Sequence, residues 1–228
     1  MESEQEINGI ARAIIRFSDS QVQIKQGQQN EQQDSESNTS LTDIVSCLES
    51  LRDQIWDNNI CKSVTQIPKL LHSLTTLSIF KVGNHIDLDV DRQKLKMRSS
   101  SRQCLYRIQK FGDAKVQTDL VYSEYGKMTF ISFCTAGGIG EEHDKEINNG
   151  LFNIYWFLRE LHEGRNEQQP SFQPLPLLAR ITEEQIEEEG ANEEIEAQMN
   201  NNKGYDVDIK YWAIVFKKVI LNHFIRRG

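Results

Sequence analysis

Apolar residues recur every three or four positions in two stretches near the start of the chain. The first set is Ile7, Ile10, Ile14 and Phe17, and the second is Leu41, Ile44, Leu48, Leu51 and Ile55. This spacing places each set along one side of a helix, as in a coiled coil or a helical hairpin. A lone helix cannot bury such a stripe, so the pattern predicts two amphipathic helices that each need a partner.

A polar segment separates the two stripes. Residues 26–40 contain no apolar side chain, and such a composition predicts a disordered Gln/Ser-rich tether. The first helix is expected within residues 1–25, with Ser3 and Glu6 spaced as a capping box and with Ser18-Asp19-Ser20 as one place for it to end. Ser40 and Asp43 form a second capping box, which predicts helices over residues 41–76.

The middle of the chain changes its period. Residues 86–91 alternate strictly between apolar and acidic side chains, and Cys104, Tyr106 and Ile108 alternate in the same way. Two further apolar runs, 116–122 and 128–134, flank a polar stretch that is typical of a hairpin loop. We therefore predict an antiparallel sheet of four to five strands within residues 77–135.

Helical spacing returns after the sheet region. The pattern predicts helices over 141–163 and 206–227, with a glycine stop at Gly164 and a Glu-rich helix that is broken at Gly190. The fold class predicted from these patterns is α+β. A domain of residues 41–228, with a sheet packed by helices, would follow a tethered N-terminal amphipathic helix.

Charge is spread unevenly along the 228 residues. The net charge is −8, yet residues 92–110 contain seven Lys or Arg and no acid, and residues 183–196 contain eight Glu and no base. The whole chain should therefore repel nucleic acid and anionic membranes at long range, although one segment could bind an anion locally. The four cysteines form no C-x-x-C pair, and the N-terminus lacks the pattern of a secretory signal. We expect an intracellular protein, cytoplasmic or nuclear.

No membrane-spanning segment is expected. The best candidate, residues 211–225, is too short and carries two lysines near its centre.

Two groups of residues are candidates for binding. The two apolar stripes predict self-association or binding of a partner protein, unless they pack on the chain's own core. The basic segment 92–110 predicts contacts with single-stranded nucleic acid, unless its cations lie in solvent or neutralise the Glu-rich run. The residues of this segment are Arg92, Lys94, Lys96, Arg98, Arg102, Tyr106, Arg107 and Lys110.

Catalytic signatures are weak. Residues 135–140 match neither the dinucleotide fingerprint nor a P-loop, and the aspartates of 87–91 lack the glycine and the glutamate of a calcium loop. No zinc spacing occurs, although a Cys–His pair built from distant segments stays open. We predict no catalytic residue, cofactor or metal. The preferred function is a non-enzymatic adaptor or complex subunit, with a second surface around Trp156 or Trp212. The alternative is a nucleic-acid-binding module.

Overall fold

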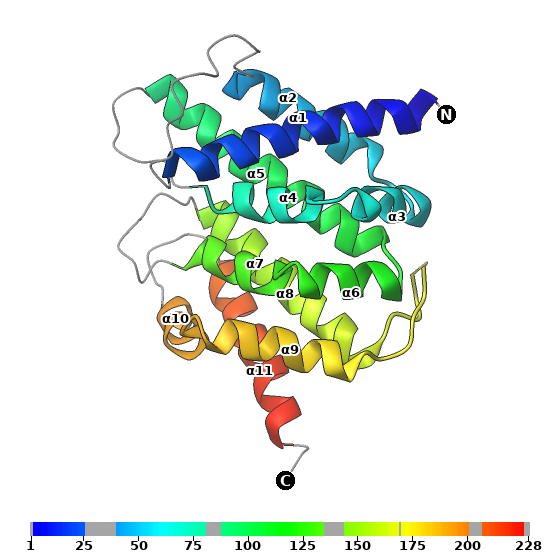
Figure 1. Cartoon of the computed structure of the whole chain (residues 1–228). Coiled ribbons are helices and arrows are strands. Elements are labelled where there is room, and N and C mark those ends of the chain that lie inside the picture. Colours follow the sequence, from blue (N-terminus) through cyan, green and yellow to red (C-terminus); the bar gives the residue numbers. More distant parts are fainter. Residues whose placement is uncertain are drawn as a thin grey trace. The chain divides into compact units, whose positions relative to one another are not determined.

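The computed structural model describes residues 2–25, 40–80, 88–134, 144–168, 170–200 and 207–225. These residues contain eleven helices, which Figure 1 colours along the chain. Within them, the one strand-like feature is an antiparallel bridge between Arg165 and Phe172. The chain divides into two compact units, residues 1–112 (unit 1) and residues 113–228 (unit 2).

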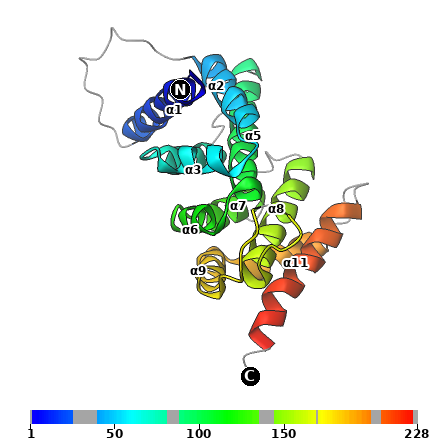
Figure 2. The ribbon, with the colours of Figure 1, turned by 90° about the vertical axis from the view of Figure 1, so that its right-hand side faces the viewer.

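Unit 1 is built around its longest internal helix. Its helices are α1 (Glu2–Lys25), α2 (Leu41–Gln54), α3 (Asn58–Gln66), α4 (Leu70–Ser78) and α5 (Leu88–Phe111). Helix α5 packs against α2, α3 and α4, and α1 packs against α2 and α4 (Figures 1 and 2). The first helix is therefore part of the packing of this unit.

Small buried side chains let the helices approach α5 closely. Ser100, Ser101 and Cys104 lie on its buried side, and the Cys104 thiol donates to the carbonyl oxygen of Leu48 at 3.2 Å. The Ser101 hydroxyl donates to the carbonyl of Met97 at 2.9 Å, so its polarity is satisfied inside the helix. The core of unit 1 thus lies between α5 and the helices α2 and α4.

Unit 2 is centred on α8. Its helices are α6 (Ala114–Tyr122), α7 (Tyr125–Phe133), α8 (Asp144–Glu163), α9 (Pro176–Glu187), α10 (Ala191–Met199) and α11 (Val207–Ile225). Helix α8 packs against α7, α9 and α11, and Figure 2 shows α9 and α11 on opposite sides of it. A Cβ atom on Gly150 of α8 would lie 2.6 Å from the ring of Phe133, so the absence of a side chain there permits the contact with α7. Helix α8, which the sequence pattern predicts, buries one apolar stripe in this core, and the stripe consists of Ile147, Leu151, Ile154, Leu158 and Leu161.

Several local predictions are confirmed. Ser40 accepts from the backbone of Asp43, and the Asp43 carboxylate accepts from the backbone of Ser40, which completes the predicted capping box. Helix α8 ends directly before Gly164, whose φ is +79°. The Glu-rich segment is helical and breaks at Gly190, whose φ is +80°. Each of these features depends on short-range backbone chemistry.

The predicted α+β fold class is wrong, because no sheet exists among the described residues. Cys104, Tyr106 and Ile108 lie on α5, and the two apolar runs predicted as strands form α6 and α7. The predicted hairpin loop between them is a helix–helix turn, in which Glu124 has a φ of +60°. Of the alternating run 86–91, the first two residues lie outside the described residues and the rest begin α5.

The physical reason is that short apolar runs satisfy two periods at once. On α5 the buried positions Met97, Ser101, Cys104 and Ile108 follow the helical spacing of three to four residues. Cys104 and Ile108 belong to this helical pattern and also to the alternating set 104, 106 and 108, so the short run is compatible with a strand as well. These segments are helical because burial between helices outweighs the β-propensity of their aromatic and β-branched residues.

The N-terminal elements differ in extent from the sequence pattern. Helix α1 continues through Ser18-Asp19-Ser20 to Lys25, and the Ser20 hydroxyl donates to the carbonyl of Phe17 at 2.7 Å. Helix α2 ends at Gln54, and α3 begins separately after Asp57, whose carboxylate accepts from the first-turn amides. The predicted tether falls outside the described residues, apart from Ser40.

Candidate interaction surface

The two predicted apolar stripes both face the core of unit 1. On α1, Ile7 is 2% exposed and Ile14 is 0% exposed, and Phe17 is also buried, whereas Ile10 is half-buried. On and directly after α2, the residues at 0% exposure are Ile44, Leu48, Leu51 and Ile55, and Leu41 is half-buried. Because α1 packs against α2 and α4, these stripes are covered within unit 1. This is the intramolecular alternative that the sequence left open.

The basic segment lies on α5, and several of its cations bind other groups of unit 1. Arg102 donates through Nε to the carbonyl of Ser78 at the end of α4, at 2.9 Å. Arg107 donates to the carbonyl of Arg52 at the end of α2, at 2.8 Å. Cations suit these positions because helix C-termini carry unsatisfied carbonyls and partial negative charge.

The remaining cations of the segment are also engaged or dispersed. Lys96 pairs with Glu49 at 3.1 Å, and Arg92 pairs with Asp89 at 3.2 Å. Lys94 lies 4.0 Å from Asp91, Arg98 is only 8% exposed, and Lys110 lies 6.0 Å from the centre of the Tyr106 ring. The residues therefore do not gather into one open cationic surface.

A cluster of aromatic side chains joins α8 and α11 in unit 2. Phe152, Tyr155 and Trp156 share one side of α8 because their spacing is three to four residues. The Trp212 ring of α11 lies 4.9 Å from the Phe152 ring at 90° and 5.4 Å from the Tyr155 ring. We call this cluster the aromatic face, and its members are Phe152, Tyr155, Trp156, Tyr211 and Trp212. Such edge-to-face contacts stabilise one arrangement of the rings.

An arginine borders the aromatic face. The Arg159 guanidinium lies 4.9 Å from the centre of the Trp156 ring, within reach of a cation–π interaction. Its Nε donates to the Glu163 carboxylate at 2.9 Å, and this hydrogen bond raises the pKa of Arg159. The guanidinium is thereby held over the ring.

The aromatic face is partly open to solvent. Tyr211 is 54% exposed, and the other four rings are half-buried. Helix α11 buries one side through Ile209, Ala213, Phe216 and Ile220, while Val215 and Val219 on the neighbouring side stay half-exposed. An apolar helix is normally covered on all sides. Among the residues of α11 whose burial is described, Tyr211, Val215 and Val219 are therefore only partly covered.

The charge of the chain belongs to unit 2. Residues 1–112 contain 14 Lys and Arg and 14 Asp and Glu, whereas residues 113–228 contain 12 and 20, so the −8 arises entirely in the second unit. Exposed glutamates of α9, α10 and the turn between them include Glu184, Glu187, Glu188, Glu193 and Glu196. Exposed lysines of the same unit lie at Lys145, Lys210 and Lys218 on α8 and α11, and at Lys115 on α6. The exposed glutamates of this unit are thus concentrated on α9, α10 and the turn between them.

The described residues offer few groups suited to catalysis, such as a reactive thiolate or a metal site. Burial raises the pKa of both Cys104 and Cys134 to about 12, which disfavours the reactive thiolate at neutral pH. His162 is paired with Glu183 at 2.8 Å, and both side chains are buried, whereas His143 lies outside the described residues. No three His, Cys, Asp or Glu side chains of the described ranges gather closely enough to hold a metal ion.

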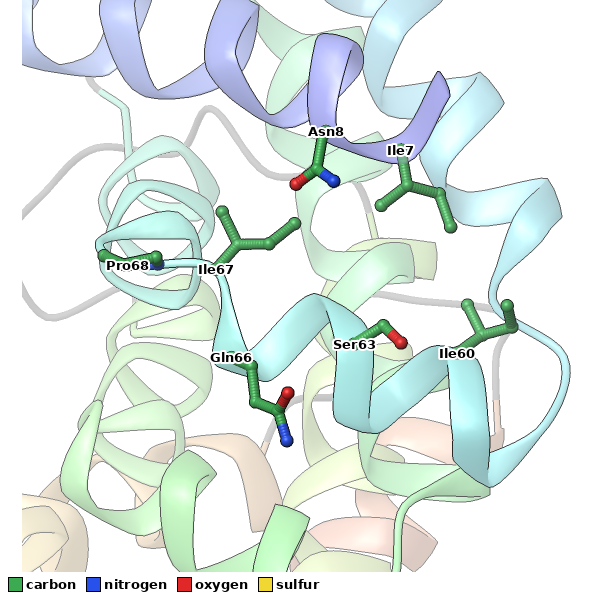
Figure 3. Close-up of a pocket in the computed structure, with 7 residues that line it drawn as sticks. All are labelled: Ile7, Asn8, Ile60, Ser63, Gln66, Ile67 and Pro68. Carbon is green, nitrogen blue, oxygen red and sulfur yellow. The ribbon is translucent and has the colours of Figure 1, made fainter. Parts of the chain in front are cut away.

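A hollow of about 400 Å³ opens beside α1 in unit 1 (Figure 3). Its lining comes from α1, α3 and the turn before α4, and consists of Ile7, Asn8, Ile60, Ser63, Gln66, Ile67 and Pro68. Its polar groups are amides and one hydroxyl, and its lining contains no acid, base or thiol. The hollow therefore offers shape but no group for acid–base chemistry.

No family model, no curated protein and no solved structure matches this chain. In the part of the chain that the structure describes, none of the helices has the length and apolar character that a membrane crossing requires.

The sequence pointed to Trp156 and Trp212 but missed three members of the aromatic face. The signal was present for Phe152 and Tyr155, because both fall beside the buried stripe of α8 and widen its apolar side. Nothing in the sequence showed that α11 would lie against that side, and Tyr211 had no signal of its own.

Proposed function

We propose that this chain is a non-enzymatic interaction protein, an adaptor or a subunit of a complex, that binds its partner through the aromatic face of unit 2. The observation that carries the proposal is a connected set of five rings, each in contact with at least one other, that remain half-buried or exposed beside Arg159. Trp, Tyr and Arg contribute most of the binding free energy in protein interfaces. Exposed apolar patches of this kind commonly mark a binding site.

Burial elsewhere supports this location. The stripes of α1 and α2 are already covered within unit 1, and the cations of α5 cap helices or form ion pairs. The raised pKa values of Cys104 and Cys134 agree with a role that needs no nucleophile. The proposal therefore moves the interaction from the N-terminal helix to the second unit.

The test is capture of partners from the native cell with the full chain and with a Tyr211→Glu variant. Tyr211 is 54% exposed, so the change should leave the fold intact and place a charge on the aromatic face. We expect captured partners to fall at least tenfold, which corresponds to a loss of about 1.4 kcal/mol of binding free energy.

The matched control is Tyr122→Glu, because Tyr122 is 67% exposed on α6 of the same unit and lies outside the aromatic face. Circular dichroism would verify that both variants keep their helices. Equal recovery of the same partners by wild type and Tyr211→Glu would contradict the proposal.

A further inference from the structure

We infer that the aromatic face binds a second copy of this chain, through the segment Gln173–Leu177 that leads into α9. The inference rests on the proposed function, since it names the partner of the same face. Both participating surfaces belong to unit 2.

The segment is an ordered and exposed apolar element. Pro174 and Pro176 are exposed, and Leu177 is 67% exposed, one of the highest values among the large apolar side chains described. The backbone amide of Leu175 donates to the carbonyl of Leu161 at 2.7 Å, which ties the segment to the end of α8. Because the segment is already fixed, little conformational entropy would be lost on docking.

The chemistry of the two surfaces matches. Proline-containing segments dock into sites lined by Trp and Tyr, where the rings of the site pack against the proline rings. The aromatic face supplies two Trp and two Tyr, and the segment supplies Pro174, Pro176 and Leu177. This pairing would cover the part of the aromatic face that is open to solvent.

Charge complementarity favours a copy of the same chain as the partner. Leu177 and the exposed Glu184 are seven residues apart on α9, and Tyr211 and the exposed Lys218 are seven residues apart on α11. Seven residues are two helical turns, about 10 Å, so each pair lies on one side of its helix. If α9 of one copy lies parallel to α11 of another, Leu177 meets Tyr211 and Glu184 meets Lys218. The exposed pair of Glu184 with Arg180 at 2.7 Å is weak enough to exchange.

This contact joins two different surfaces, so it is heterologous. Each bound pair leaves one aromatic face and one segment unoccupied, and further copies can add until a ring closes or a filament forms. Mass in solution should therefore rise with concentration.

Sedimentation of the full chain over a concentration series tests the inference. We expect wild type and the Tyr122→Glu control to associate, and Leu177→Glu and Tyr211→Glu to be monomeric, each with unchanged helix content by circular dichroism. An equimolar mixture of Leu177→Glu and Tyr211→Glu should form a 1:1 dimer that grows no further, because one variant keeps the face and the other keeps the segment.

Three outcomes would overturn the inference. They are a monomeric wild type at all concentrations, association that survives Leu177→Glu but not Tyr211→Glu, and a mixture that stays monomeric. If wild type is monomeric while capture of another protein depends on Tyr211, the proposed function stands and only the self-contact fails. If neither measurement depends on Tyr211, both fail.

Discussion

Gly164 ends α8 in a backbone conformation that other residues rarely adopt. Its φ is +79°, and its amide donates to the carbonyl of Glu160 at 2.9 Å. A Cβ atom there would lie 2.7 Å from the carbonyl oxygen of Phe172, which is backbone and cannot turn aside. Gly9 in the middle of α1 is the opposite case, because it is exposed and a Cβ atom would meet nothing within 4 Å.

The two glycines should therefore respond in opposite directions to the same substitution. We expect Gly164→Ala to destabilise unit 2 by about 2 kcal/mol, since the left-handed conformation alone costs an L-residue roughly 1–2 kcal/mol. Gly9→Ala should stabilise unit 1 by about 1 kcal/mol through its higher helix propensity. Hydrogen exchange of peptides from α8 and from α1 would measure each change. A neutral Gly164→Ala would show that the turn can relax.

At the residue scale the sequence is informative wherever the determining chemistry is local. The capping box of Ser40 and Asp43 involves two side chains and two backbone groups within one turn. The stops at Gly164 and Gly190 depend on the φ of one residue. These features need no knowledge of what the helix packs against, so they could be identified before the fold was known.

Helices α8 and α9 are joined by a buried polar pair. His162 Nε2 lies 2.8 Å from a carboxylate oxygen of Glu183, and the two side chains are 4% and 6% exposed. On the same helix α9, Arg180 and Glu184 are 2.7 Å apart, but their side chains are 62% and 56% exposed. The two pairs have similar distances but differ in burial. A comparison of their interaction energies therefore measures the effect of burial.

A double-mutant cycle on each pair should give different coupling energies. For His162→Leu and Glu183→Leu we expect about 1–3 kcal/mol, because either single change leaves a buried polar group without this partner. For Arg180→Ala and Glu184→Ala we expect about 0.5 kcal/mol or less, since water and salt screen the pair. Denaturant unfolding of the single and double variants gives both values. Equal couplings would mean that burial does not strengthen the first pair.

At the element scale the sequence predicted helices well only where one period was supported over several turns. The stripe of α8 repeats over four turns, whereas the apolar runs within α6 and α7 are short, because these helices have nine residues each, and such runs fit a strand equally well. Their helical state depends on neighbours such as Gly150, which admits the Phe133 ring. The aromatic face has the same limit, because Phe152 and Trp212 are distant in sequence and only the fold brings them to 4.9 Å.

At the scale of the whole chain, the two units differ in charge and in how far their apolar surface is covered. Unit 1 has balanced charge and covers its apolar stripes internally, whereas unit 2 carries the net charge of −8 and the exposed aromatic face. Like charge on unit 2 discourages unspecific association, because copies repel each other until complementary patches meet. The net charge of unit 2 would therefore favour the proposed contact over unspecific association.

The sequence pattern predicts that α1 is a tethered helix, whereas in the structure α1 packs within unit 1. This difference changes what a mutation on α1 should do to stability. A detachable helix on a tether would tolerate a charge on its apolar stripe without loss to the rest of the chain. In the structure Ile14 is 0% exposed, and α1 packs against α2 and α4. An aspartate at position 14 would lose the burial of the isoleucine, worth about 1.5–3 kcal/mol, and would place a carboxylate in the core.

We therefore expect Ile14→Asp to destabilise unit 1 by about 3 kcal/mol or more. Val22→Asp on the same helix should change stability by about 0.5 kcal/mol or less, because Val22 is 36% exposed. Hydrogen exchange of peptides from α2 and α5 would report unit 1, and peptides from α8 would report unit 2, whose protection should not change. If Ile14→Asp left α2 and α5 fully protected, α1 would be separable from unit 1, and its stripe would again be available to a partner.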